Sequence, residues 1–276
     1  MFLPKDVPKN QKGLPLLVDV HGGGFVANIP AIDDPVCRYL ADHGRCVVVS
    51  IDYRKAPQDT FPAGYEDVVE QVQTLIASRY LDIDPEKVML FGSSAGGNLV
   101  LATAQDASLK GKVLGVMALY PVTDCGLSMR EKMATRPDAG VPDLLESSYD
   151  GIQEAYLGES EAARKTLAND VRASPGAFEK REDLPKNVYL LGAEHDLLCH
   201  EAEVMAERLA DGVERVLGKD GWRAESVRWE NVKGQTHGFD VFGRQGETKE
   251  QKVQRSAAKD ETYERMAGWV RDIAQI

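Results

Sequence analysis

One short stretch, GSSAG at residues 92–96, constrains the fold of this chain more than any other feature. An apolar run precedes it and a helix-compatible segment follows it. Glycine at Gly92 and Gly96 permits a turn so tight that larger side chains there would clash. Such a turn presents the hydroxyl of Ser94 at the end of a strand, near the positive end of a helix. The pattern therefore predicts a strand–turn–helix unit that displays a nucleophilic serine.

Apolar runs of strand length alternate with segments of helical period along the rest of the chain. The runs expected as strands are 16–20, 47–51, 88–91, 113–120, 188–191 and 227–232, with a turn at 84–86. The segments expected as helices are 65–76, 98–107, 202–216 and 263–273. This alternation predicts an α/β fold, with a mostly parallel sheet and helices as crossover connections.

The stretch from about 125 to 185 is longer than a crossover connection needs, and it is rich in charge and proline. Six of its apolar residues could form one face: Leu144, Leu145, Tyr149, Ile152, Tyr156 and Leu157. We therefore expect a small helical lid inserted before the strand at 188–191. The alternative is a disordered surface loop. The whole chain, 1–276, is otherwise expected to form a single domain.

A serine hydroxyl needs a base to accept its proton, and five histidines are available. In folds with this serine turn, the chain order is serine, acid, histidine, with the histidine after the last strand. His237 fits that place. His43 is expected at the surface, and His195 and His200 are expected to be ordinary loop residues.

The acid should lie on the loop after the strand at 188–191, where Asp196 can orient the histidine and stabilise its charged form. Glu194 stays open as an alternative, because spacing alone does not select one acid within a loop. Glu201 is less suited, since it begins the next predicted helix, where its charge would favour the helix dipole.

A run of three glycines, His21-Gly22-Gly23-Gly24, ends the first predicted strand. Glycines let a backbone turn its N–H groups toward a ligand, as stabilisation of an oxyanion requires. Gly23 and Gly24, together with the N–H of Ala95, are therefore the candidate oxyanion hole. His21 and Gly22 are expected to support this loop rather than to react.

Composition excludes several other classes of protein. The net charge is −11, which disfavours nucleic acid and anionic lipid surfaces as partners. The four cysteines are scattered and form no CxxC pair, so neither a disulfide framework nor a zinc site is expected. No signal peptide or apolar run long enough to span a membrane is evident, which predicts a cytoplasmic protein.

Seven motifs together resemble those of the hormone-sensitive-lipase-like esterases, the α/β-hydrolase fold-3 group. They are HGGGF at 21–25, DYRKAP at 52–57, FPAGYEDV at 61–68, GSSAGGN at 92–98, LYPVTD at 119–124, HDLL at 195–198 and THGF at 236–239. The resemblance implies an α/β-hydrolase fold and a serine carboxylesterase acting on short-to-medium acyl esters. It also implies no metal, no organic cofactor and a lid that shapes the pocket. Some relatives pair through their last strand and helix, so a homodimer is open.

Three positions depart from that family. Ser93 stands where an acidic residue often precedes the nucleophile, and His200 stands where a second aspartate often follows the acid. Only about 20 residues precede His21, so the first strand and the N-terminal part of the lid are expected to be absent. Residues 2–4 are then the tail of a second strand, and an exposed sheet edge would favour dimerisation.

Three other readings of function stay open. A deacetylase, lactonase or polyketide-tailoring hydrolase would use the same site. An acyltransferase would replace water by an alcohol. A non-catalytic small-molecule receptor on this fold is disfavoured, because such relatives have usually lost the histidine that His237 supplies.

Overall fold

The computed structural model describes residues 1–7, 11–158, 160–244 and 246–276, so one position of the predicted lid, 159, lies outside the described residues. Its core is one eight-stranded sheet in the order β2-β1-β3-β4-β5-β8-β7-β6. The strands are β1 Leu14–Val20, β2 Val47–Ile51, β3 Ile83–Ser93, β4 Gly115–Leu119, β5 Asn187–Ala193, β6 Val216–Leu217, β7 Gly221–Ala224 and β8 Val227–Val232. All neighbouring pairs from β2 to β8 are parallel, and the β6–β7–β8 edge is antiparallel.

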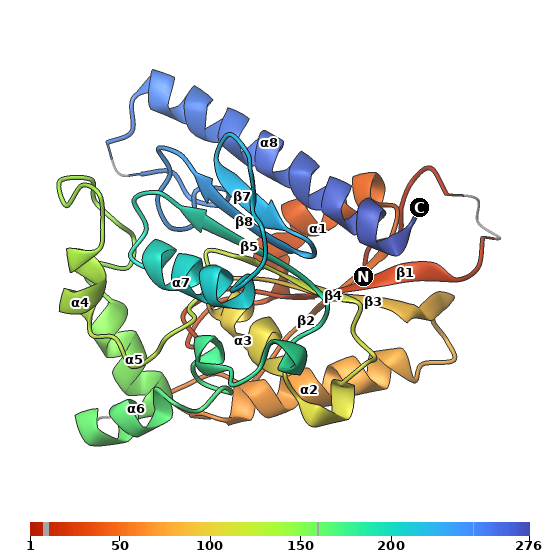
Figure 1. Cartoon of the computed structure of the whole chain (residues 1–276), viewed down its shortest axis with the longest axis horizontal. Helices are drawn as coiled ribbons and strands as arrows, with labels where there is room; N and C mark the ends of the chain where they lie inside the picture. Colours follow the sequence, from red (N-terminus) through yellow and green to blue (C-terminus); the bar gives the residue numbers. More distant parts are fainter. Residues whose placement is uncertain (8–10, 159, 245) are drawn as a thin grey trace.

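Helices cover both faces of this sheet, as the alternating pattern predicted (Figure 1). The helices are α1 Asp34–Gly44, α2 Ala63–Ile76, α3 Ala95–Thr103, α4 Met129–Ala134, α5 Tyr149–Leu157, α6 Glu161–Leu167, α7 Cys199–Leu209 and α8 Lys249–Ala274. Short 3-10 turns lie at Pro30–Asp33, Ala107–Leu109, Pro175–Ala177 and Arg181–Asp183. The α/β class with a mostly parallel sheet is therefore confirmed.

Two hydrophobic clusters hold the layers together, one on each face of the sheet. On β1, Leu16 and Val18 belong to the cluster under α2, α3 and α7, whereas Leu17 belongs to the cluster under α1 and α8. This follows because successive side chains of a strand point to opposite faces. Every residue of β1 is buried, as expected for a strand covered on both sides.

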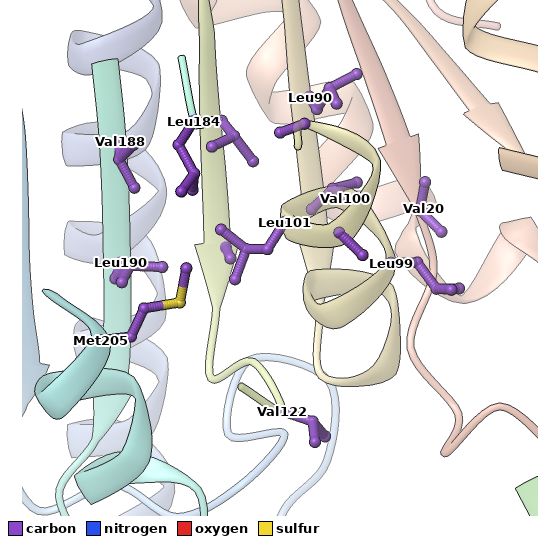
Figure 2. Packing of buried hydrophobic residues seen from close by; sticks show 14 of the residues in the cluster. Val20, Leu90, Leu99, Val100, Leu101, Val122, Leu184, Val188, Leu190 and Met205 are labelled. Carbon is purple, nitrogen blue, oxygen red and sulfur yellow. The ribbon is translucent and has the colours of Figure 1, made fainter. Parts of the chain in front are cut away.

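Helix α3 lies deepest in the molecule, and all nine of its residues are buried. Figure 2 shows Leu99 and Leu101 among the side chains of the same hydrophobic cluster as Val20 and Leu190. A helix this tightly held cannot shift without disturbing the sheet. The turn that joins it to β3 is therefore fixed in position.

Two local predictions are wrong. Residues 84–86 do not form a turn, because β3 already begins at Ile83. Pro85 is tolerated there since the β1–β3 ladder is irregular between Leu14 and Leu16. The helix expected to reach 216 ends at Leu209, and Val216 instead begins β6, part of a hairpin that was not predicted.

The segment between β4 and β5 carries α4, α5 and α6 beside one end of the sheet (Figure 1). Its expected apolar residues are mostly covered: Tyr149, Tyr156 and Leu157 are buried, whereas Leu144 is 52% exposed. We call residues 125–185 the insertion from here on.

The N-terminal residues expected as the tail of a strand lie on the edge of the sheet. Phe2 forms a single antiparallel bridge with Val48 of β2, with N–O distances of 2.8 and 3.0 Å in the two directions. Among the described residues, no helix combines the length and the apolar character needed to span a membrane.

Candidate active site

Ser94 lies at the turn between β3 and α3, where the sequence placed it. Its backbone φ and ψ are 53° and −118°. This conformation is energetically unfavourable for any residue other than glycine, and it persists only where the surrounding structure enforces it. A Cβ added at Gly92 would lie 2.4 Å from the oxygen of Gly96, and one at Gly96 would lie 1.8 Å from the oxygen of Val20. Both glycines are therefore required for this turn.

Three residues that are far apart in the chain meet at this turn. His237, on the loop after β8, places Nε2 2.8 Å from Oγ of Ser94. Its Nδ1 lies 2.8 Å from Oδ2 of Asp196, on the loop after β5. The second oxygen of Asp196 accepts a hydrogen bond from the backbone N–H of Leu198 at 2.9 Å, which fixes the carboxylate. The arrangement can move a proton from the serine to the histidine.

The electrostatic surroundings favour the charged form of His237. Burial by itself would lower the pKa of His237, but the carboxylate of Asp196 and its hydrogen bond outweigh burial. Asp143 and Asp240 act in the same direction, so the pKa of His237 lies above its ordinary value. An imidazolium formed during a reaction would therefore be stabilised.

The glycine run lies against the serine turn. Gly23 and Gly24 adopt φ of 134° and 62°, values that side chains rarely allow. In the part of the chain that the structure describes, the N–H groups of these two glycines donate to no protein acceptor. Helix α3 makes its first hydrogen bond from Asn98 to Ser94, so the N–H of Ala95 precedes the helical ladder. These three donors are available to a ligand.

His21 and Gly22 have the supporting positions expected for them. His21 is fully buried, with Nε2 3.0 Å from Oδ1 of Asp52, and its ring stacks on Tyr53. A Cβ added at Gly22 would lie 3.0 Å from the oxygen of Ser93, so this glycine permits the close approach of the two loops.

The structure places the alternative acids away from His237. Glu194 accepts from the backbone N–H of Gly234 at 2.8 Å and from Lys233 at 3.1 Å. Glu201 lies in the first turn of α7, as expected, where its charge favours the helix dipole. It is buried in an ion pair with Lys132 of the insertion and accepts from the N–H of Thr123 at 2.8 Å.

Two of the remaining histidines are exposed at the surface, His43 and His200. His195 is half-buried, and its backbone N–H donates to the backbone oxygen of Gln235 at 2.8 Å. That bond ties the loop of the acid to the loop of His237.

A cavity of about 230 Å³ opens beside Ser94 and His237. The glycine run forms one wall, and the insertion supplies the apolar residues Leu144, Leu145 and Ile152. Val241 and Phe242 from the loop after β8, with Ile32 of the 3-10 turn Pro30–Asp33, complete its apolar lining. No group of three or more His, Cys, Asp or Glu residues among those described is arranged to hold a metal ion.

Sequence reasoning missed three polar residues around this cavity. Asp33 and Tyr120 line it directly. Asp240 lies behind it and accepts hydrogen bonds from the hydroxyls of Tyr120 and of Tyr263, the latter at 3.0 Å. Asp240 follows the THGF motif at 236–239, which is the one signal that could have indicated it. Asp33 stands in an ordinary acidic pair before a helix, so no local pattern marks it.

The comparisons with known proteins agree with this geometry. The sequence matches the family described as alpha/beta hydrolase fold over residues 17–241. It is 31% identical over 219 residues to a versiconal hemiacetal acetate esterase of Dothistroma septosporum, covering 74% of this chain and 63% of that protein. It is 34% identical over 211 residues to the enzyme of the same name from Aspergillus parasiticus, covering 72% of this chain and 62% of the relative. The chain thus spans less than two thirds of the length of these relatives.

A solved structure gives the same result for the fold. The hyperthermophilic esterase of the archaeon Pyrobaculum calidifontis superposes with a TM-score of 0.75 at 28% sequence identity, covering 97% of this chain and 79% of the esterase. The sheet, the serine turn and the family match point the same way. The chain therefore belongs to the α/β-hydrolase fold family, in the hormone-sensitive-lipase-like group that its motifs indicated.

Proposed function

We propose that the protein is a serine carboxylic-ester hydrolase that acts on short-to-medium acyl esters through an acyl-enzyme. The observation that carries this proposal is the continuous hydrogen-bonded chain from Ser94 through His237 to Asp196, with both links at 2.8 Å. It ends at a cavity that can receive a substrate. The esterase names of the relatives support the same class of reaction.

In the proposed reaction, the oxygen of Ser94 attacks the ester carbonyl while His237 accepts the serine proton. Asp196 holds the imidazole in the tautomer that presents Nε2 as the acceptor. The carbonyl oxygen becomes an oxyanion, which the N–H groups of Gly23, Gly24 and Ala95 would stabilise.

His237 then donates its proton to the leaving alcohol, and the acyl group stays on Ser94. Water attacks this acyl-enzyme with His237 again accepting the proton, and the carboxylic acid leaves. Because the pKa of His237 is raised, its imidazole is a better proton acceptor. This helps when Ser94 attacks the ester and again when water attacks the acyl-enzyme.

We further propose that the insertion acts as a lid that limits the size of the substrate. Its residues Leu144, Leu145 and Ile152 close one side of a cavity of only about 230 Å³. An acyl group as small as acetate fits such a space, and the relatives from Dothistroma and Aspergillus are named for an acetate ester. Long acyl chains would require this wall to move.

The test is hydrolysis of p-nitrophenyl acetate, butyrate, octanoate and dodecanoate by the wild type and by Ser94→Ala. We expect the wild type to cleave the two short esters and the variant to lose this activity while keeping the same melting temperature. Equal activity in both folded proteins, or none in either, would contradict the proposal. Hydrolysis restricted to the long esters would contradict the proposed lid.

A further inference from the structure

The cavity beside Ser94 contains one carboxyl group that the proposed reaction does not use, Asp33. This residue ends the 3-10 turn Pro30–Asp33 and is 2% exposed, and it lines the cavity together with Ser93 and Ser94. Its side chain has one hydrogen bond among the described residues, a long one of 3.4 Å from the hydroxyl of Ser93. A carboxyl group this deeply buried normally has a cation or several donors as partners.

No cation fills that role in the part of the chain that the structure describes. Among the described residues, no lysine or arginine lines the cavity, and Asp33 takes part in no ion pair. The charged groups that act on Asp33 are instead further acids, namely Asp19 of β1, Asp240 of the loop after β8 and the adjacent Asp34. Asp19 is itself fully buried and accepts a hydrogen bond from the hydroxyl of Ser50 at 2.5 Å.

Burial raises the pKa of Asp33 well above its ordinary range, and the negative charges of Asp19 and Asp240 raise it further. The same cause, burial, raises the pKa of Asp19 to about 7. Burial and these neighbouring charges therefore favour the protonated form of Asp33. A positively charged group in the cavity would favour its carboxylate form instead.

Two aromatic residues line the same cavity, Tyr120 and Phe242. Aromatic rings attract ammonium groups through their electron-rich faces, and a nearby carboxylate adds a direct charge interaction. An unpaired carboxyl group beside aromatic walls is the combination that recognises an ammonium ion.

We infer that the cavity selects esters that carry an ammonium group, with Asp33 as the countercharge of that group. This inference names a substrate class for the proposed esterase and rests on that proposal. Asp33 is a specificity-determining residue in this account and takes no part in the proton transfers of Ser94 and His237.

Hydrolysis of a matched pair of esters tests the inference. Acetylcholine and 3,3-dimethylbutyl acetate have the same shape, and they differ in a positively charged nitrogen against a neutral carbon. The quantity to measure is the ratio of kcat/KM for the charged ester to that for the neutral ester. Because both esters undergo the same chemical steps, a change in those steps alters both kcat/KM values equally and leaves this ratio unchanged.

Asp33→Asn should lower this ratio about tenfold, because it removes the countercharge while keeping the shape of the side chain. Asp82→Asn is the control, since Asp82 is exposed and does not line the cavity. The control should leave the ratio unchanged. An unchanged ratio in Asp33→Asn would overturn the inference.

The wild type alone provides a second test that does not depend on how a variant folds. The ratio should rise with pH, since Asp33 gains its charge as the pH passes its raised pKa, whereas acetylcholine stays charged throughout. The groups around Asp33 whose charges bear on this titration are Asp19, Asp34, Cys37, Tyr53, Tyr120, Tyr263 and Asp240. The hydroxyl of Ser93 donates to Asp33, and His237 lines the same cavity. A ratio that stays flat or falls as the pH rises would overturn the inference.

Binding of tetramethylammonium, measured by calorimetry without any ester, separates the two proposals. If the wild type binds it and Asp33→Asn does not, the ammonium site is supported even when neither ester is cleaved, and only the esterase proposal fails. If the neutral ester is cleaved but tetramethylammonium does not bind, the esterase proposal stands and the ammonium site is overturned.

Discussion

The two walls of the cavity are built in different ways. The wall that carries Ser94 belongs to the sheet, where β3, the tight turn and the fully buried helix α3 leave no freedom of position. The opposite wall belongs to the insertion, where Ile152 and Leu145 are half-buried and Leu144 is 52% exposed. Under the proposed function, proton transfer would take place at the rigid wall and the looser wall would select the substrate.

The walls are nevertheless joined. Arg136 of the insertion has a buried guanidinium and donates from Nε to the backbone oxygen of His195 at 3.0 Å, beside Asp196. Ile152 also lies against the glycine run, because a Cβ added at Gly24 would be 2.9 Å from its Cδ1. Changes in the insertion should therefore alter the chemistry slightly, and changes in the sheet wall should alter it severely.

The largest expected effect distinguishes the roles of two carboxylates on one loop, Asp196 and Glu194. Asp196→Asn should reduce kcat/KM for p-nitrophenyl acetate by about 10³- to 10⁴-fold, because an amide stabilises the wrong tautomer of His237. Glu194→Gln is the control, since Glu194 bonds to Gly234 and Lys233 instead. Loss of activity in Glu194→Gln together with full activity in Asp196→Asn would reverse the assignment.

A change in the looser wall should alter selectivity far more than catalysis. Ile152→Ala removes part of the apolar wall that lies against the glycine run. We expect the ratio of kcat/KM for the octanoate ester to that for the acetate ester to rise about tenfold. A change of this size is typical when the volume of an apolar pocket changes by a few methyl or methylene groups. Ile152→Leu conserves the volume and should leave the ratio nearly unchanged. Equal losses on both esters in Ile152→Ala would show that the insertion serves catalysis instead.

The smallest effect concerns Asp143, an acid of the insertion whose charge acts on His237. Neutral His237 is the form that accepts a proton, and its pKa is raised, so kcat/KM should increase with pH through a midpoint above about 6.5. Asp143 is buried in the insertion and contributes to that rise. Asp143→Asn should therefore lower the midpoint by less than about one pH unit.

Asp138→Asn is the matched control for this change, because Asp138 belongs to the same segment but is exposed. Its pH profile should coincide with that of the wild type. A midpoint that rises in Asp143→Asn would contradict the sign of the interaction.

Local motifs and chain order predicted the rigid wall well. Each part of this wall follows the carboxyl end of a parallel strand. The glycine run follows β1, Ser94 follows β3, and the loops of Asp196 and His237 follow β5 and β8. The carboxyl ends of such strands lie at the same edge of a sheet. Their meeting could thus be expected from order alone.

The remainder depends on contacts between distant segments, which no local pattern records. Asp33 and Asp143 look like ordinary surface acids in the sequence, and only the packing of loops buries them. The buried pair of Lys132 and Glu201 likewise joins α4 to α7 across a long stretch of chain. The β6–β7 hairpin was missed because its strands are short and Val216 continued the helical spacing before it.

The most direct test of the central claim identifies the atom that attacks. We would treat the protein with a reactive organophosphate ester, which forms a stable adduct with an activated serine, and locate the adduct by peptide mass spectrometry. The account predicts one adduct on Ser94, and none in the Ser94→Ala or His237→Ala variants. An adduct on Ser93, or a folded wild type that forms no adduct at all, would contradict it.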